Sequence, residues 1–148
     1  MTTPYALVSA AADVRRGTKR ELVALTRRLE RQALGRTPPA VADSLQDERF
    51  LTERTRAVYA ELAAAGAVAR LHARGLQSWL APGVEGVALD EGDPLVDQWV
   101  VVLPGREPVV LAATDLHDDG CADDARSFTY AISHDPHVVA GCGRLLGI

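Results

Sequence analysis

The sequence has few aromatic residues, two cysteines and no long apolar run. Aromatic side chains make up 5% of the 148 residues, so leucine, valine and alanine have to fill most of the interior. Cys121 and Cys142 form neither a metal-binding spacing nor a disulfide framework. No window approaches the roughly 18 apolar residues of a membrane span, and no basic segment precedes the apolar stretch 1–12 as it would in a secretory signal. We therefore expect a reduced, cytoplasmic protein without membrane contact.

Lysine is almost absent, and the charge is divided unevenly along the chain. Lys19 is the only lysine, and arginine supplies the other positive charges. Residues 1–36 hold eight basic and three acidic side chains, a net charge of +5. Since the whole chain has a net charge of −4, the remainder carries −9. An acidic body is unusual for a nucleic-acid-binding protein, so no direct nucleic-acid binding is expected. The basic segment is interpreted as a solvated helix face, with an acidic partner or a second copy of the acidic body as alternatives.

Composition and length fit one globular domain. Apolar residues make up 47% and charged residues 24% of the chain, as in ordinary soluble domains. A single core usually serves about 100–200 residues. We expect a flexible N-terminal arm over 1–17, followed by one domain over 18–148.

Three helices and several strands are expected. Thr18 with Glu21 is a capping-box pattern, Thr52 can cap a second helix, and Asp135 before Pro136 starts a third. A Pro104-Gly105 turn joins two of the strands as a hairpin, while 76–86 and the acidic segment 115–124 are interpreted as loops. The pattern predicts an α+β fold with a mixed, largely antiparallel sheet. The expected helices cover 18–35, 52–66 and 135 onward, and the expected strands cover 40–43, 67–71, 87–89, 99–103, 109–113 and 128–132.

Potential metal ligands occur in the acidic loop and near the last helix. The loop from Asp115 to Cys121 partly resembles a calcium loop, but Arg126 stands at the twelfth position, where a bidentate glutamate is needed. His134 and His137 are three residues apart and could share a transition metal with other ligands. A solvated loop and surface histidines are the preferred interpretation, so no metal or other cofactor is expected.

No catalytic constellation is evident. The serines lack the glycine-flanked turn that exposes a nucleophile. Cys142 lies on the expected apolar face of the last helix, where a thiol usually serves packing. The acidic pairs of the 115–124 loop lack the apolar surroundings that would tune a general acid.

Four residues are candidates for ligand binding. Trp99 could form one wall of a pocket, with Gln98 orienting the ligand. Arg49 and Arg126 could hold a carboxylate or phosphate. For Trp99 the alternative is packing against the sheet, and for the arginines it is a structural ion pair.

In order along the chain, these segments resemble one known family, the DICT sensory domain. The first half of its pattern is similar to residues 38–41, 46–50 and 55–62. In the second half, Asp93-Pro94-Leu95 with Trp99 resembles the family's Asp-Pro-Leu…Glu-Trp strand, with Gln98 in place of the glutamate. Residues 109–116, Arg126, Phe128 and 135–145 resemble the segments that follow.

The resemblance implies a bacterial regulatory domain without catalytic residues to carry over. We expect it to bind a small molecule or a protein partner, such as a signalling protein or a transcription regulator, and to form a homodimer. Two alternatives from other classes are kept open. One is a small metal-dependent enzyme using His117, Cys121, His134 and His137. The other is a DNA-binding accessory protein that uses the basic first helix.

Overall fold

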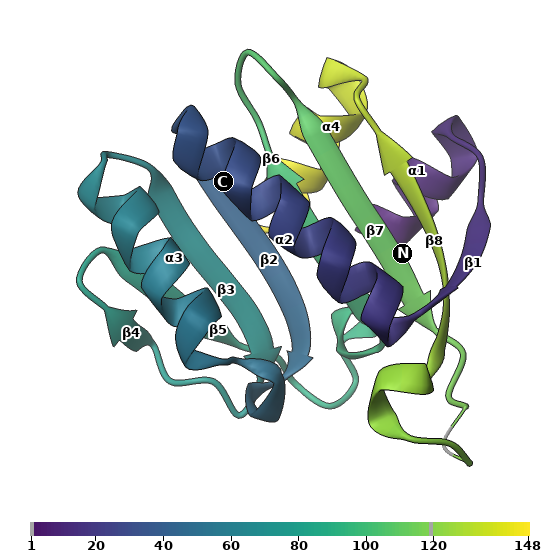
Figure 1. The fold of residues 1–148 in the computed structure, drawn as a ribbon. Helices are drawn as coiled ribbons and strands as arrows, with labels where there is room; N and C mark the ends of the chain where they lie inside the picture. The colour runs from purple at the N-terminus through teal and green to yellow at the C-terminus, as the bar shows by residue number, and fades with distance from the viewer. Residues whose placement is uncertain (1, 119) are drawn as a thin grey trace.

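The computed structural model describes residues 2–118 and 120–148. These residues form four α-helices and one eight-stranded mixed sheet (Figure 1), which confirms the α+β prediction. The helices are α1 (Pro4–Ala11), α2 (Lys19–Gly35), α3 (Glu53–Ala64) and α4 (Pro136–Leu145). The strands are β1 (Arg15–Thr18), β2 (Ala40–Asp47), β3 (Val68–Arg74), β4 (Trp79–Ala81), β5 (Val84–Ala88), β6 (Gln98–Leu103), β7 (Val109–Asp115) and β8 (Ser127–Ser133).

The sheet is antiparallel except around β3. Its order is β1-β8-β7-β6-β2-β3-β5-β4, and only the β2–β3 and β3–β5 pairs run parallel. The helix α3 makes the connection between the parallel strands β2 and β3. Figure 1 shows α2 and α3 on one face of the sheet and α1 and α4 on the other. The result is a three-layer domain with the sheet in the middle.

Three of the helix starts follow the local signals in the sequence. The Thr18 hydroxyl accepts a hydrogen bond from the Glu21 amide, and the Thr52 hydroxyl accepts one from the Thr55 amide. The Asp135 carboxylate caps α4 in the same way, with Pro136 in the first turn. Because each cap satisfies an amide that the helix leaves free, the side chain fixes where the helix begins.

The N-terminal segment differs from the flexible arm predicted over 1–17. Thr3 caps α1, and Val8 of this helix is fully buried. The segment continues into β1, which pairs with β8 at the edge of the sheet. The partner strand lies more than 100 residues away along the chain, so no local pattern indicated this pairing.

Two further segments are more regular than expected. The strand predicted over 40–43 extends to Asp47, with a bulge before its end where Gln46 adopts φ 72°. The predicted loop 76–86 contains β4 and the start of β5, joined through Pro82 and Gly83. Gly83 has φ +76°, a conformation that a tight proline–glycine turn requires.

Side-chain alternation gives the sheet two separate cores. One core lies under α2 and α3 and includes Val41, Leu71 and Val101. The other lies under α1 and α4 and includes Ala42, Val100 and Val102. Successive residues of a strand point to opposite faces, so β2 and β6 contribute to both cores. Within the described part of the chain, no helix is both long and apolar enough to cross a membrane.

The Gly86 position should not tolerate a side chain. A Cβ built there would lie 1.9 Å from the Gln77 carbonyl oxygen, and the Gly86 amide donates to the Ser78 carbonyl at 2.8 Å. We expect Gly86→Ala to lower the free energy of unfolding by about 1–3 kcal/mol through overpacking, measured by urea denaturation. Gly92→Ala is the control, because nothing lies within 4 Å of its Cβ position. Equal stability of the two variants would contradict the packing around β5.

Candidate functional site

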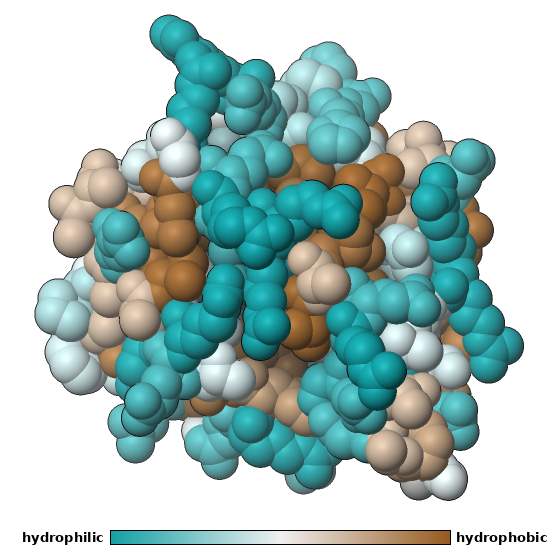
Figure 2. Space-filling view, in the orientation of Figure 1, coloured by the Kyte–Doolittle hydropathy of each residue, from teal (hydrophilic) through white to brown (hydrophobic). Residues whose placement is uncertain are grey.

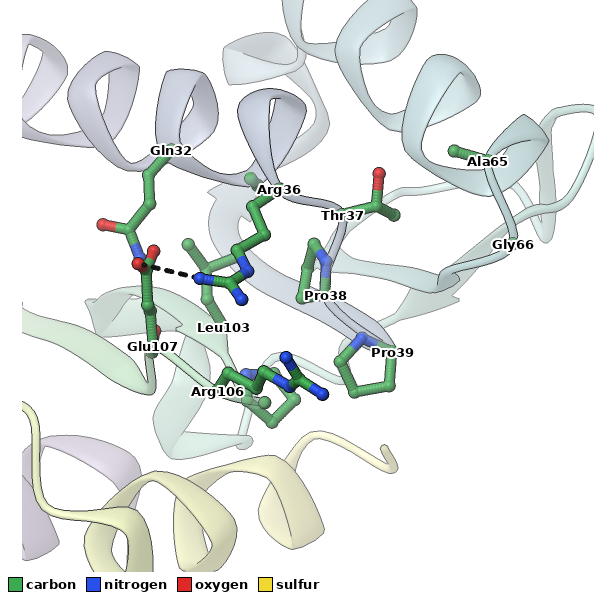
Figure 3. A pocket seen from close by; sticks show the side chains of 13 residues that line it. Gln32, Arg36, Thr37, Pro38, Pro39, Ala65, Gly66, Leu103, Arg106 and Glu107 are labelled. Atoms are coloured by element: carbon green, nitrogen blue, oxygen red, sulfur yellow. Dashed lines mark hydrogen bonds and ion pairs between the residues drawn. The ribbon is translucent and has the colours of Figure 1, made fainter.

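Two of the cavities in the described part of the chain border α2. The first, about 630 Å³, lies where α2 ends and the β6–β7 hairpin turns (Figure 3). Its polar side chains largely bind one another: Arg36 and Glu107 form an exposed ion pair of 3.5 Å, and Gln32 donates to the Glu107 carbonyl at 3.2 Å. None of the buried side-chain atoms that lack a hydrogen-bond partner in the described chain lines this cavity. Nothing in the described lining of this cavity therefore indicates a specific ligand.

The second cavity lies between α2 and α3, over β2 and β6. Its volume is about 470 Å³, within the range of ordinary small-molecule sites. Figure 2 shows this side of the molecule, where hydrophilic side chains over the two helices alternate with hydrophobic surface. We call it the α2–α3 pocket. It is lined by Lys19, Val23, Thr26, Arg27, Glu30, Asp43, Leu45, Arg49, Phe50, Thr52, Arg54, Thr55, Trp99 and Asp123.

A buried acid forms part of the pocket lining. Alternation along β2 points Asp43 to the same face as Val41 and Leu45, toward α2 and α3. The Asp43 side chain is 1% exposed, and neither of its oxygens has a hydrogen-bond partner within the described residues. Burial raises the pKa of Asp43 well above its usual range, and the negative charge of Glu30 adds to the increase. Asp43 is therefore held as the neutral acid over a wider pH range than an exposed aspartate.

Tyr59 of α3 is the polar neighbour of Asp43. Its hydroxyl is close enough to oppose part of the increase in the Asp43 pKa, yet the pair does not meet hydrogen-bond geometry, and the hydroxyl also lacks a partner. Burial and the nearby Asp43 raise the pKa of Tyr59 well above its ordinary value. The two groups together leave unmet hydrogen-bonding capacity at one place in the interior.

Glu30 is the second buried acid of the pocket. It is 5% exposed on α2, and burial raises its pKa while Arg54 and Arg27 oppose the increase. Its nearest charged contact is Arg54, at 3.5 Å between Nη2 and Oε1. Glu30 thus has a cationic partner, which Asp43 does not.

Cationic side chains dominate the rim of the pocket. Lys19 pairs with Asp123, and Arg54 pairs with Glu30. Neither Arg27 nor Arg49 forms a hydrogen bond or ion pair with a carboxylate among the described residues; the Arg49 guanidinium instead lies 4.8 Å from the centroid of Phe50. Two guanidinium groups therefore remain available for an anion.

The aromatic walls are fixed by polar contacts. The Trp99 indole N–H donates to the Thr26 hydroxyl at 3.2 Å, and its ring meets Phe128 edge-on at 5.9 Å. The Phe50 ring lies 4.0 Å from the Lys19 ammonium. These contacts hold the walls in place without a ligand, as in a largely preformed site.

The structure brings together two of the four residues predicted to bind a ligand. Arg49 and Trp99 both line the α2–α3 pocket. Gln98 lies on the opposite face of the sheet, where its side-chain oxygen accepts from the Tyr5 amide at 3.1 Å. Adjacent strand residues cannot share a pocket on one face of the sheet, so Gln98 cannot orient a ligand beside Trp99 as predicted.

Arg126 lies next to the pocket but does not line it. Its guanidinium donates to Asp115 at 2.7 Å and to Asp123 at 3.0 Å, and it lies 5.3 Å from the Phe50 centroid. Arg126 is 9% exposed. Its contact with Asp115 is the structural ion pair that was the alternative to ligand binding for this arginine. Through Asp123 and Phe50 it supports the wall of the pocket.

Asp43 and Glu30 are the site residues that sequence reasoning missed. The signal for Asp43 was present, because an acid directly follows the apolar residues Ala40, Val41 and Ala42. Glu30 lies near the apolar stripe of α2 among surface arginines and gives no comparable signal. Their convergence depends on how α2 crosses the sheet, which no local pattern contains.

The histidines considered as metal ligands lie apart. His117 follows the end of β7 and its Nε2 is 3.0 Å from Asp97, whereas His134 contacts the carbonyl of Pro108, just before β7 begins. A seven-residue strand separates these places by roughly 20 Å. Among the described residues no three histidine, cysteine or acidic side chains are grouped for a metal. Of the calcium-like loop, Asp119 lies outside the described residues, and the Asp115 carboxylate is bound to Arg126.

A family model covers most of this architecture. The model described as "Sensory domain in DIguanylate Cyclases and Two-component system", DICT, matches residues 7–114. The chain belongs to the DICT family. The match begins within α1 rather than at residue 18, which includes most of that helix in the family domain. It ends in β7, so the resemblance noted for Arg126 and 135–145 lies beyond the matched range.

Solved structures share the fold of this DICT domain. The archaeal chromatin protein TrmBL2, whose structure is described as showing a novel mode of DNA binding, is 15% identical with a TM-score of 0.55; the match covers 90% of this chain and 50% of that one. Polyphosphate kinase from Porphyromonas gingivalis is 13% identical with a TM-score of 0.60, over 95% of this chain and 26% of that one. The chain thus spans half or less of either protein. Identities this low show the fold alone, and no curated protein matches the chain.

Replacing the buried acid should change how stability depends on pH. Because the folded-state pKa of Asp43 is raised, its contribution to stability is fully present below about pH 4 and is lost as pH rises through the folded pKa. Asp43→Asn cannot ionise, so we expect its stability relative to wild type to increase with pH. The slope is at most about 1.4 kcal/mol per pH unit for one proton. Urea denaturation at several pH values measures it, and Asp13→Asn at an exposed position is the control. Parallel pH curves for Asp43→Asn and wild type would contradict the buried neutral acid.

Removing Arg126 should destabilise the fold. The Arg126→Met variant leaves the Asp115 carboxylate, which is 5% exposed, buried without its cation. Breaking such a pair costs about 3–5 kcal/mol, and urea denaturation measures the loss. The exposed Arg20–Asp124 pair provides the control, because Arg20→Met should leave stability unchanged within error. An equally stable Arg126→Met variant would show that the pair does not hold the pocket wall.

Proposed function

We propose that this DICT domain is a non-catalytic sensor that binds a small molecule in the α2–α3 pocket. One observation carries the proposal: Asp43 is almost fully buried beside a cavity, and both of its oxygens lack a partner in the described chain. Buried polar groups are normally hydrogen-bonded, and the exceptions call for a specific explanation. A ligand with complementary polar groups supplies the missing partner.

The hydroxyl groups of the pocket support a binding role over a nucleophilic one. The Thr26 hydroxyl accepts from Trp99, and the Thr52 and Thr55 hydroxyls bond to each other at 3.1 Å. An activated nucleophile needs a general base within hydrogen-bond reach. The described lining contains no histidine, cysteine or serine that could form such a pair.

The sensory role of the family requires an output. We infer that ligand binding is passed by non-covalent contact to a signalling protein or a transcription regulator, with a homodimer as the responding unit. Native mass spectrometry with and without ligand tests the second part, and a mass that stays monomeric at all protein concentrations would contradict it.

Trp99 provides a direct reporter of pocket occupancy. The chain has two tryptophans, and Trp79 is 66% exposed on the edge strand β4. In a Trp79→Phe protein, the tryptophan fluorescence therefore comes from Trp99 alone. We expect a chemically diverse compound library to yield ligands that change this fluorescence, raise the melting temperature and are recovered unchanged by mass spectrometry. Saturation at 100 times the Kd stabilises the fold by about 2.7 kcal/mol.

A pair of cavity variants locates the binding site. Val23→Phe places a ring in the α2–α3 pocket, and Ala65→Phe alters the cavity at the end of α2. The proposal requires binding to be lost in the first variant and kept in the second. Chemical conversion of the ligand would contradict a non-catalytic role, and binding that survives Val23→Phe would contradict this pocket.

A further inference from the structure

The α2–α3 pocket combines a deep polar end with a cationic rim, and this combination restricts what it can bind. At the deep end, Asp43 lines the pocket, and Tyr59 is its neighbour outside the lining; both are almost fully buried, at 1% exposure each. A neutral carboxyl donates one hydrogen bond and accepts others, and a phenol does the same. Hydroxyl groups match this mixed donor and acceptor character, whereas an isolated anion would meet the negative Glu30 nearby.

The rim has the opposite preference. Two of its four cations are committed, Lys19 to Asp123 and Arg54 to Glu30. Arg27 lies on α2 and Arg49 on the single 3-10 turn Glu48–Phe50 after β2, and neither guanidinium group forms an ion pair with a carboxylate in the described chain. Guanidinium is the side-chain group best suited to bind carboxylate and phosphate through paired hydrogen bonds.

The start of α3 adds to this preference. Thr52 and Thr55 line the pocket at the N-terminus of this 12-residue helix, where the helix dipole is positive. The Thr55 amide donates to the Thr52 hydroxyl, while the N–H groups of Glu53 and Arg54 have no acceptor within the helix. A negative group at the rim is therefore favoured by both the arginines and the helix terminus.

We propose that the ligand of the α2–α3 pocket is a small hydroxylated organic anion. Its carboxylate or phosphate group binds at Arg27 and Arg49, and a hydroxyl group binds Asp43. This rests on the proposed sensory function and specifies the chemical class of the ligand. The volume of about 470 Å³ accommodates a molecule of a few to about a dozen heavy atoms in contact with the walls.

Matched probes test the anionic group. Binding to the Trp79→Phe protein is measured by Trp99 fluorescence and calorimetry, with glycerol 3-phosphate, ribose 5-phosphate and gluconate against glycerol, ribose and glucose. We expect each anion to bind at least about ten-fold more tightly than its uncharged counterpart, with affinity that falls as salt is added. Inorganic phosphate alone is included to separate charge from hydroxyl recognition.

Charge-neutralising variants locate the anion. Arg27→Gln with Arg49→Gln should weaken the anionic probes about ten-fold or more. Arg28→Gln, one residue along α2 and outside the pocket lining, should leave binding unchanged. Asp43→Leu should weaken glycerol 3-phosphate several-fold and leave inorganic phosphate unaffected, because only the former carries carbon-bound hydroxyls that can reach Asp43 at the deep end.

The outcomes distinguish this inference from the function on which it rests. Uncharged counterparts that bind as tightly as the anions, or an equal effect of Arg28→Gln, would overturn the anionic class. Neutral or cationic library compounds that bind in the pocket while every anionic probe fails would overturn the class and leave the sensory pocket intact. If no compound of any charge changes Trp99 fluorescence or the melting temperature, both proposals fall.

Discussion

Side-chain alternation along β2 and β6 decides which residues of this domain can meet. Helices cover both faces of these central strands, so two consecutive residues of a strand belong to different cores. Trp99 reaches Thr26 of α2, whereas Gln98 reaches the first turn of α1. The same rule sends Asp43 toward α2 while Ala42 packs against the other layer. The composition of the pocket is therefore a consequence of strand register, and a shift of one residue in β2 would remove its acid.

An acid at the Asp43 position is unfavourable for folding alone. An apolar residue of similar size would bury surface without leaving polar atoms unpaired, and an unpaired buried polar group costs about 1–3 kcal/mol. The surrounding fold is well packed enough to bear this cost, since the strands on both sides of β2 are lined by buried valine, leucine and alanine. Local sequence choices that oppose stability are typical of functional positions. The bulge at Gln46, with its positive φ, lies three residues from Asp43 at the end of the same strand.

How much the sequence could predict depends on how local each signal was. Thr18, Thr52 and Asp135 act on amides two or three residues away, and the helices they begin lie where the sequence indicated. The pairing of β1 with β8 and the short β4 depend on contacts made only after the chain has folded, and both were missed. Thr3 followed by Pro4 is a helix-start signal for α1 of the same kind. The pocket required more, because its residues come from segments beginning at 19, 43, 99 and 123.

The helix α2 connects the pocket with distant parts of the surface. It contributes Val23, Thr26, Arg27 and Glu30 to the lining, and so meets any occupant along two of its turns. At its start, the Lys19 amide donates to the Arg126 carbonyl at 2.9 Å, next to the 115–124 loop. At its other end, Gln32 and Arg36 contact Glu107 of the β6–β7 hairpin. A ligand that moves α2 against the sheet must therefore strain or release both contacts. The Arg36–Glu107 pair is exposed, whereas Arg126 is buried, so the end of α2 at Arg36 would yield at lower cost than its start.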